Sequence, residues 1–365
     1  MPDDPAPGPR TRPDGVAKLA PPPPSATARP NALLALALAA LLLALAVGAA
    51  AATDPRNELW GPLPGSRFRP LVADWPAEKL DRFDRLAAPP ATLVMGTSRG
   101  MALPPNATGG PGEAFNLAFP GGEVAVVRAL YASLAVDGRR PERVVYALDQ
   151  WSLRDHREDR VAESSERARL GGQAPSLGDR AAQLASTLSL PYLQDVARSA
   201  GYAFGSGYPD PGFHFAADGS MRYPAFEAPG YDQADHIALG IRELDSAFGV
   251  NRAIDPEAQA DLDAFLAEAS GNGTLVQVVL PPLHPQALAH LQDNPRFRAF
   301  TETTVDTVRR HCGPRVQLHD LTDPASIGAD PADFYDSHHP YLRNGARILE
   351  AVADGHLDAC RGGHA

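Results

Sequence analysis

Two short blocks of this 365-residue sequence carry side chains that together could perform nucleophilic catalysis. The first block reads Gly96-Thr-Ser-Arg-Gly100 and follows an apolar run, with Ser98 at its centre. A serine on such a turn exposes its hydroxyl and places its backbone N–H at a helix start, where negative charge is favoured. This setting is typical of a nucleophile that also supplies an oxyanion donor, and an ordinary helix N-cap is the alternative.

The second block lies later in the chain and reads Asp333-Phe-Tyr-Asp336-Ser-His338-His339-Pro340. An expected tight turn brings Asp336 beside His339, where a carboxylate can hold an imidazole as a general base. The spacing selects His339 as that base and leaves His338 as the fallback. Metal binding through Asp336, His338 and His339 is a second interpretation, and a solvated surface turn is a third.

Other polar residues and glycines stand directly after the remaining apolar runs. Asn116, Gly121 and Gly122 follow the second run and are candidates for oxyanion donors. The two glycines stand at an expected helix start, where they allow close approach of the backbone and offer N–H groups. A plain tight turn is the alternative. The residues expected to line a pocket, with turn chemistry as the alternative, are Arg99, Asp149, Gln150, His284 and His338.

Five apolar runs of strand length must position these residues. They are Ala91–Met95, Ala114–Ala118, Arg143–Leu148, Leu275–Leu280 and Val316–Asp320. Helical patterns at 123–136, 255–269, 286–291, 297–312 and 344–353 separate or follow them, and Asp255 with Pro256 is typical of a helix start. Alternating strands and helices predict an α/β fold with three layers, in which a central parallel sheet of about five strands is covered on both faces.

In an open sheet of this kind ligands bind beyond the carboxyl ends of the strands, which is where the candidate residues stand. The alternation breaks between about residues 151 and 235, too long a stretch for a simple connection. We expect an insertion that caps the site. Its aromatic residues either stack on sugar rings or pack internally; they are Tyr202, Phe204, Tyr208, Phe213, Phe215 and Tyr223.

The segment Ala32–Ala52 contains only Ala, Leu, Val and one Gly, and it is long enough to cross a hydrocarbon core as a helix. We expect an uncleaved signal-anchor at 31–53 that contacts the lipid bilayer, and a cleaved signal peptide is the alternative. Basic residues before it (Arg10, Arg12, Lys18, Arg29) outweigh those after it and favour a cytoplasmic N-terminus with the rest of the chain on the extracytoplasmic, periplasmic side.

The remaining organisation follows from composition. Residues 1–30 are Pro-rich and expected to be a disordered cytoplasmic tail, 54–90 a stalk with a leading helix, 91–354 the main domain, and 355–365 a short tail. The net charge of −11 argues against nucleic acid as the partner. Cys312 and Cys360 either form one disulfide in an oxidising compartment or remain free thiols.

The order of the blocks carries more information than any one of them. Gly-x-Ser after the first strand, Asn and Gly after the second, and Asp-x-x-His before the last helix resemble the SGNH (GDSL-like) hydrolase superfamily over about Ala91–Asp354. More narrowly, the chain resembles the membrane-anchored bacterial branch related to polysaccharide O-acetylation and teichoic-acid D-alanylation proteins.

The resemblance implies a flavodoxin-like sheet and assigns roles residue by residue. Ser98 would be the nucleophile, His339 and Asp336 the base and acid, and Ser98 with Gly121 or Gly122 the oxyanion donors, with Asn116 in the second block. The sequence departs from the family in reading Gly-Thr-Ser in place of Gly-Asp-Ser, and in lacking the Gly-x-Asn-Asp block, where Leu148-Asp149-Gln150 stands. Gln150 is the substitute for the missing side-chain donor.

The implied function is an esterase or O-acyltransferase that acts on acyl esters of a cell-envelope or secreted polysaccharide and needs no cofactor or metal. A membrane-bound acyltransferase is the partner that the resemblance implies. The alternative is a non-catalytic SGNH-like binding or assembly component of envelope polysaccharide biosynthesis, which the missing third block favours.

Overall fold

The computed structural model of the chain describes residues 28–56, 65–69, 71, 75–105, 113–120, 124–136, 138–154, 185, 187–209, 213–248, 253–355 and 358–360. The tail predicted at 1–30 falls almost wholly outside these described residues, as do Gly121, Gly122 and most of the tail predicted at 355–365.

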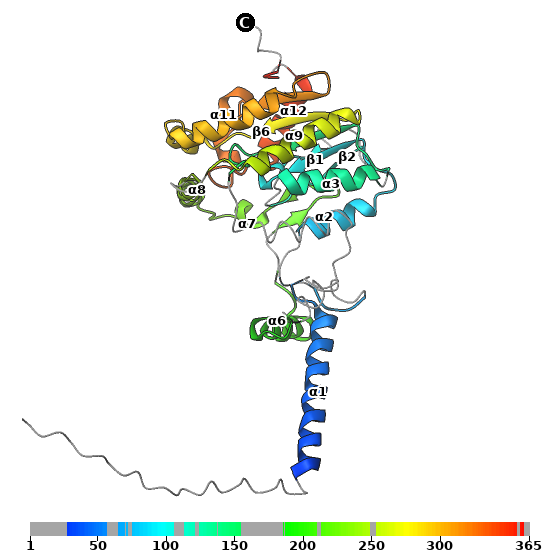
Figure 1. Ribbon diagram of the computed structural model, residues 1–365. Helices are drawn as coiled ribbons and strands as arrows, with labels where there is room; N and C mark the ends of the chain where they lie inside the picture. The colour runs from blue at the N-terminus through cyan, green and yellow to red at the C-terminus, as the bar shows by residue number, and fades with distance from the viewer. Residues whose placement is uncertain are drawn as a thin grey trace, which may run out of the picture.

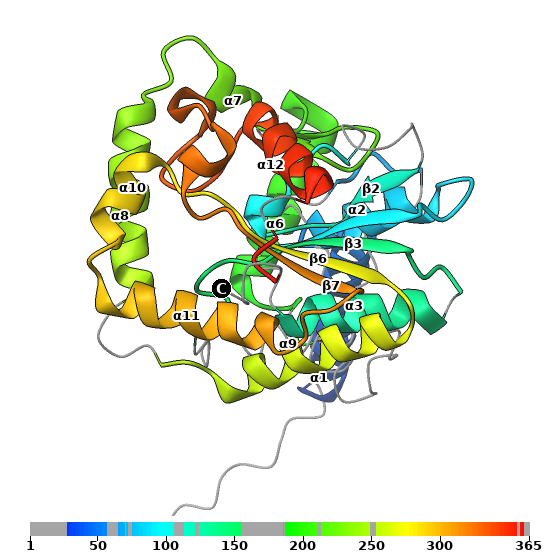
Figure 2. The ribbon, with the colours of Figure 1, turned by 90° about the horizontal axis from the view of Figure 1, so that it is seen from above.

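A parallel five-stranded sheet forms the centre of the domain, as predicted, with the order β2-β1-β3-β6-β7 (Figure 2). The strands are β1 (Thr92–Gly96), β2 (Ala114–Asn116), β3 (Arg143–Ala147), β6 (Leu275–Leu280) and β7 (Val316–Asp320). The chain continues from β1 to β2 on one side of β1 and then returns to β3 on the other side, so the topological switch point lies between β1 and β3. Doubly wound sheets open a crevice for ligands at such a point.

Helices cover both faces of the sheet (Figure 1). Alternate strand residues point to opposite faces, so Leu93 and Met95 enter one core while Val94 enters the other. The first core packs against α2 (Trp75–Asp84), α3 (Val124–Val136), α9 (Pro256–Gly271) and α11 (Pro295–Arg309). The second core packs against α12 (Leu342–Asp354).

The helix starts follow the local chemistry of the sequence. The Asp255 carboxylate accepts the backbone N–H of Glu257 at the start of α9, and Asn294 caps α11 in the same way. His284 performs this role for α10 (Pro285–Leu291) through its Nδ1 atom. Each of these caps precedes a proline at the first helical position, where the missing N–H costs nothing.

The insertion is longer than the sequence predicts. Its far boundary at residue 235 falls inside α8 (Gln233–Ala247), and an antiparallel bridge between Arg154 and Ile254 marks where the chain returns to the domain. Its described elements are α6 (Leu190–Gly201), a π-helical turn (Tyr202–Ser206), the hairpin β4 (His214–Phe215) and β5 (Met221–Arg222), and α7 (Pro224–Glu227). The charged run between Arg154 and Arg169 lies mostly outside the described residues.

An apolar helix, α1 (Ala28–Thr53), projects from the rest of the molecule (Figure 1). Over the 22 residues Ala32–Thr53 it is long and apolar enough to cross a membrane, and its leucines from Leu33 to Leu45 are exposed in the isolated chain. The predicted apolar span is therefore present as a single helix, and its composition matches that of a membrane anchor or a signal sequence.

A disulfide between Cys312 and Cys360 decides between the two alternatives for these residues. It fixes a short segment beside the edge strand β7, where Ala359 donates its N–H to the Leu318 carbonyl at 2.6 Å and Asp358 bridges to His319. Unpaired edge strands invite pairing with other chains, so this segment protects that edge of the sheet.

Opening the disulfide should destabilise the domain. It closes a loop with a sequence separation of 48, and a loop of this order is worth about 2–4 kcal/mol of unfolding free energy. We expect Cys312→Ser to lower the free energy of unfolding of the full-length protein in detergent by that amount, measured by denaturant titration. Reductant should destabilise the wild type equally and leave Cys312→Ser unaffected; an equal effect of reductant on both would contradict a structural bridge.

Candidate active site

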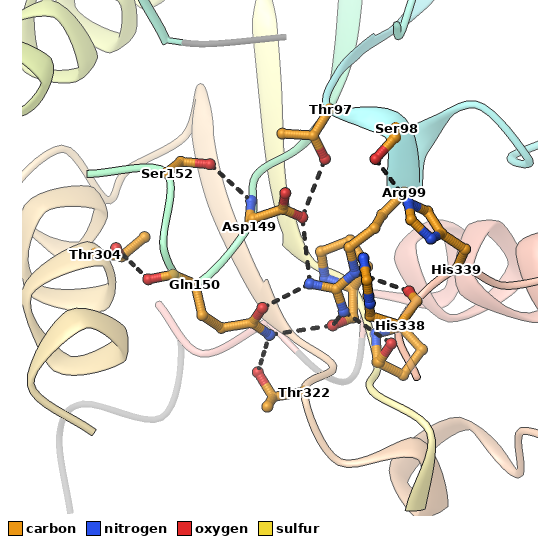
Figure 3. A network of polar contacts seen from close by, with 12 residues as sticks. Thr97, Ser98, Arg99, Asp149, Gln150, Ser152, Thr304, Thr322, His338 and His339 are labelled. Carbon is orange, nitrogen blue, oxygen red and sulfur yellow. Dashed lines mark hydrogen bonds and ion pairs between the residues drawn. The ribbon is translucent and has the colours of Figure 1, made fainter. Parts of the chain in front are cut away.

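The structure brings Ser98, His339 and Asp336 into one hydrogen-bonded relay. Ser98 opens a 3₁₀ turn (Ser98–Gly100) at the carboxyl end of β1, and its Oγ lies 2.8 Å from His339 Nε2 (Figure 3). His339 Nδ1 lies 2.8 Å from Asp336 Oδ2. Both distances are within hydrogen-bond reach, as a nucleophile, base and orienting carboxylate require.

The loop that carries Asp336 is a tight turn held by the same carboxylate. Asp336 Oδ1 accepts the backbone N–H groups of His338 and His339, each at 2.9 Å. Tyr335 donates its N–H to the His339 carbonyl at 2.9 Å and closes the turn. One carboxylate oxygen thus folds the loop while the other faces the imidazole, which explains the Asp-x-x-His spacing.

Electrostatics at the pair favour an ionised Asp336 and a basic His339. Burial by itself would raise the pKa of Asp336, but the charge of a protonated His339 and the hydrogen bonds from His339 and from the His338 backbone lower it well below its usual range. Burial would lower the pKa of His339, and the charge and hydrogen bond of Asp336 overcome this and raise it. The carboxylate therefore supports proton uptake by His339.

His338 has a different position and is not hydrogen-bonded to Ser98. Its Nδ1 lies 2.8 Å from Ser337 Oγ, and its ring packs edge-on against Trp151. Burial and the neighbouring charge of His339 lower its pKa, so it stays neutral. Between the two histidines, the structure selects His339 as the partner of Ser98.

The turn before Ser98 requires a glycine at its first position. Gly96 has φ +122°, and a Cβ at this position would lie 2.0 Å from the backbone oxygen of Ala147 on β3. Thr97 then donates its N–H to the Ala147 carbonyl at 3.2 Å and its hydroxyl to Asp149 Oδ1 at 3.0 Å. The Gly96-Thr97-Ser98 block thus ties the turn of Ser98 to the end of β3.

Arg99 is fully buried and connects the loops around the site (Figure 3). Its guanidinium donates to Asp149 Oδ1 at 3.2 Å, to Gln150 Oε1 at 2.6 Å and, from Nε, to the His338 carbonyl at 3.1 Å. It also donates to the backbone carbonyls of Pro281, in a very short contact, and Pro282, at 2.8 Å. One charge therefore joins the ends of β1, β3 and β6 to the loop of the triad.

The other residues predicted to line a pocket are engaged in this interior network. Gln150 is fully buried, and its amide donates to the Pro281 carbonyl and to Thr322 Oγ1. His284 is buried and caps α10. With Arg99 and Asp149, these side chains position the loops. Both the oxygen and the nitrogen of Gln150 are hydrogen-bonded within the protein, so its side chain is not placed as the oxyanion donor expected from the sequence.

Asn116 also has a structural position. Its side-chain nitrogen donates to the carbonyls of Gly100 and Leu103, each at 2.8 Å, so it holds the loop after Ser98 in place of offering a donor to an oxyanion. Its oxygen accepts from Lys79 Nζ at 2.9 Å. Lys79 is buried, and desolvation lowers its pKa although Asp218 opposes the shift. Sequence analysis missed Lys79 because its partners lie far away in the chain.

Among the described residues, the backbone N–H of Ser98 is the candidate for an oxyanion donor. It belongs to the first residue of a helical turn, whose N–H groups have no partner within the turn. Gly121 and Gly122, the predicted second donors, lie outside the described residues.

The same side chains meet the distance requirement for a metal site. One ligand atom from each of Asp336, His338 and His339 lies within 4.8 Å of the others. Both ring nitrogens of His339 are, however, engaged with Ser98 and Asp336. A metal would have to displace one of these partners, so metal binding and the serine relay are mutually exclusive arrangements of this cluster.

The insertion packs on the triad loop, the segment Phe334–Tyr341 that carries Asp336 and His339. Tyr231 donates its hydroxyl to the Tyr335 carbonyl at 2.5 Å, and Tyr341 donates to the Phe226 carbonyl at 2.6 Å. Tyr223 lies 4.8 Å from the Tyr335 ring. Tyr223 is thus one of the six aromatic residues singled out from the sequence that contacts the triad loop, whereas Phe213 and Phe215 pack at the second core.

Comparison with known proteins adds no assignment to this geometry. No protein-family model matches the sequence, and a search of curated proteins found no significant match.

Removing the charge of Asp336 should change the pH dependence of any reaction that uses His339. The Asp336 carboxylate raises the pKa of His339, so Asp336→Asn should lower that pKa and move the acid limb of activity to lower pH. The plateau rate should fall by roughly 10³–10⁴-fold, because the amide no longer holds the productive tautomer. Both effects are measured from the pH dependence of the rate at which a serine-directed fluorophosphonate labels Ser98 or an acetyl ester is hydrolysed. An acid limb that does not move would contradict the pairing of Asp336 with His339.

Removing Arg99 should destabilise the fold as well as the site. Arg99→Met leaves Asp149 buried without its cation, and breaking one side of a buried ion pair costs about 3–5 kcal/mol. Denaturant unfolding of the full-length protein in detergent measures this loss. Arg309→Met, which changes an arginine with an exposed side chain, is the matched control and should stay within about 0.5 kcal/mol of wild type. Equal stability of the two variants would refute the central role of Arg99.

Proposed function

We propose that this protein is a membrane-anchored, extracytoplasmic serine esterase or O-acyltransferase of the SGNH type, acting on acyl esters of a cell-envelope or secreted polysaccharide. The observation that carries the proposal is the unbroken relay from Ser98 Oγ through His339 to Asp336, with 2.8 Å at each step. Serine, imidazole and carboxylate in this order perform acyl transfer on several unrelated folds.

The chemistry follows from the positions of the three side chains. With Nδ1–H donated to the Asp336 carboxylate, His339 Nε2 is free to take the proton from Ser98 Oγ as the oxygen attacks the carbonyl carbon of the ester. The backbone N–H of Ser98 faces the developing oxyanion. His339 then gives this proton to the departing alkoxide oxygen, which leaves as an alcohol, and the acyl group remains on Ser98.

The second half of the reaction reverses these steps with a new acceptor. A water or a sugar hydroxyl gives its proton to His339 Nε2 and attacks the acyl carbon, and Ser98 leaves with the proton returned by His339. Water as acceptor makes the protein an esterase, and a sugar hydroxyl makes it an acyltransferase. A membrane-bound acyltransferase that supplies the acyl group is the partner expected for the second case.

Two features support a location outside the cytoplasm. The basic residues that precede α1 favour a cytoplasmic N-terminus, which puts the domain on the far side of the membrane. The Cys312–Cys360 disulfide is typical of proteins in oxidising compartments. A domain tethered there meets envelope glycans before most metabolites, and this, with the resemblance of the motif blocks, is the basis for the substrate class.

A non-catalytic binding or assembly component is the second candidate function. The observation that favours it is the end of β3, where Asp149 and Gln150 are tied to Arg99 in the position at which the family carries a side-chain oxyanion donor. Loss of one such donor reduces a rate by about 100- to 1000-fold, so a weakened or absent activity is the expectation of this alternative.

A serine-directed fluorophosphonate probe distinguishes the two candidates. We expect the full-length protein in detergent to be labelled, because the His339–Asp336 pair activates Ser98 for attack on phosphorus as on carbon. Ser98→Ala should abolish labelling and hydrolysis of acetyl-ester substrates. The matched control is Ser270→Ala, which removes a hydroxyl at the exposed end of α9 and should leave labelling unchanged.

Absence of labelling in the wild type, with acetyl-ester hydrolysis unaffected by Ser98→Ala, would exclude the catalytic proposal and favour the binding component. Activity that a chelator abolishes and zinc restores would instead indicate the metal arrangement of Asp336, His338 and His339.

A further inference from the structure

The insertion returns to the base of the molecule and packs on the end of α1, a contact that the catalytic proposal does not use. Figure 1 shows α6 beside the end of α1 that lies nearest the rest of the molecule. Tyr192 donates its hydroxyl to Asp54 Oδ1 at 3.0 Å in a buried contact. Arg56 donates to Asp195 Oδ2 at 2.9 Å and lies over the Tyr192 ring.

This contact lies at one end of the apolar span. At about 1.5 Å per residue, the 22 residues Ala32–Thr53 cover about 33 Å, close to the roughly 30 Å of a hydrocarbon core. The leucines of the span are exposed up to Leu45, whereas Ala50 and Thr53 near its end are buried. If α1 crosses a bilayer, α6 therefore lies at the level of the lipid headgroups.

The sides of α6 differ in polarity in a way that matches this depth. Asp195 faces Arg56, which comes after the span and therefore lies on its aqueous side. With about 3.6 residues per turn, Leu190, Leu193 and Ala197 come out roughly 140–160° around the helix from Asp195. That apolar side therefore lies opposite the Asp195–Arg56 contact, and its first member, Leu190, is 69% exposed.

The turn after α6 continues the apolar edge and adds aromatic rings. Phe204 is 71% exposed, and its ring meets Phe68 at 5.6 Å in an edge-on contact. Tyr202 and Tyr208 pack against each other beside it. Aromatic residues gather at membrane–water interfaces, where an apolar ring can sit beside polar groups.

Exposed cations accompany the apolar edge. Arg198 pairs with Asp195 on the polar side of α6 with most of its side chain exposed. Arg67 and Arg69 are exposed on either side of Phe68 in the segment that packs on this turn. Arginines on the polar side of an amphipathic helix favour anionic lipid headgroups.

We propose that α6 and the turn Tyr202–Ser206 form an interfacial helix, which inserts the edge defined by Leu190, Leu193 and Phe204 into the headgroup–acyl boundary of the bilayer that α1 crosses. This inference rests on the membrane anchoring included in the proposed function. It gives the protein a second membrane contact, built from the insertion and joined to the anchor through Asp54 and Arg56. The two contacts together fix the tilt of the anchor end and the height of the domain above the lipid.

Site-directed fluorescence in lipid nanodiscs tests the proposal. The sequence has two cysteines and the structure joins them, so Leu190→Cys offers one free thiol for an environment-sensitive nitrobenzoxadiazole label. Full-length protein is reconstituted with phosphatidylcholine and phosphatidylglycerol, with or without acyl chains that carry a nitroxide quencher. We expect blue-shifted emission and several-fold stronger quenching at Leu190→Cys than at Arg198→Cys, the matched position on the polar side of the same helix.

Two further labelled variants make each outcome decisive. Phe204→Cys repeats the measurement on the turn, in case the label at Leu190 disturbs α6. Leu41→Cys reports on the span itself and should be quenched strongly. Quenching at Leu41 with aqueous emission at both Leu190 and Phe204 would overturn the interfacial helix and leave the anchor intact. No quenching at Leu41 would overturn the membrane anchor. Blue-shifted emission at Leu190 without quenching by the lipid would show that the label contacts protein and not the membrane, which would equally overturn the proposal.

Discussion

The buried charge of Arg99 is the constraint on which the site depends. A guanidinium removed from water loses several kcal/mol of solvation, and this loss must be offset by hydrogen bonds from all sides. The protein provides them from Asp149, Gln150, two proline carbonyls and the carbonyl of His338. Because these acceptors come from the ends of β3 and β6 and from the loop of His338, while Arg99 itself follows β1, satisfying one charge also sets where the Ser98 turn stands relative to His339. The relay of Ser98 and His339 is short because the loops that carry them share this neighbour.

A second polar cluster performs the same task on the other side of the nucleophile. Asn116 holds the carbonyls after Ser98, and Lys79 holds Asn116 and the Ala118 carbonyl. Both side chains are buried, so each hydrogen bond left unmade would carry a desolvation penalty. The residues around Ser98 are therefore held by side chains that do not themselves take part in proton transfer. Among the described residues, the site therefore has many contacts that position Ser98 and few hydrogen-bond donors that face a ligand.

The sequence allowed the sheet to be predicted well because buried parallel strands have a strong local signature. All five predicted runs begin within one residue of a strand, and β2 is shorter than its apolar run because Asn116 already ends it. Ser98 was found from the rule that ligands collect at the carboxyl ends of strands, and Asp336 and His339 from their Asp-x-x-His spacing. The roles of Asn116, Gln150 and His284 were not predictable in this way, since a polar residue after a strand can equally serve a cap or a buried network. The insertion was the least predictable part: α6 is amphipathic, but its partner α1 is far away in the chain and invisible to local patterns.

The segment Asp358–Cys360 pairs with the outer edge of β7, and its position in the chain determines when that edge is covered during synthesis. Cys360 follows every strand of the sheet along the chain, so its bond to Cys312 cannot form until the whole sheet-forming segment has been synthesised. Until then the outer backbone of β7 is open to pairing with a neighbouring nascent chain. The edge of β7 is therefore exposed to aggregation after the strands have been synthesised, until oxidation of Cys312 and Cys360, and not hydrophobic collapse, fixes the covering segment. A compartment that keeps thiols reduced would leave that edge open, which couples closure of the β7 edge to oxidising conditions.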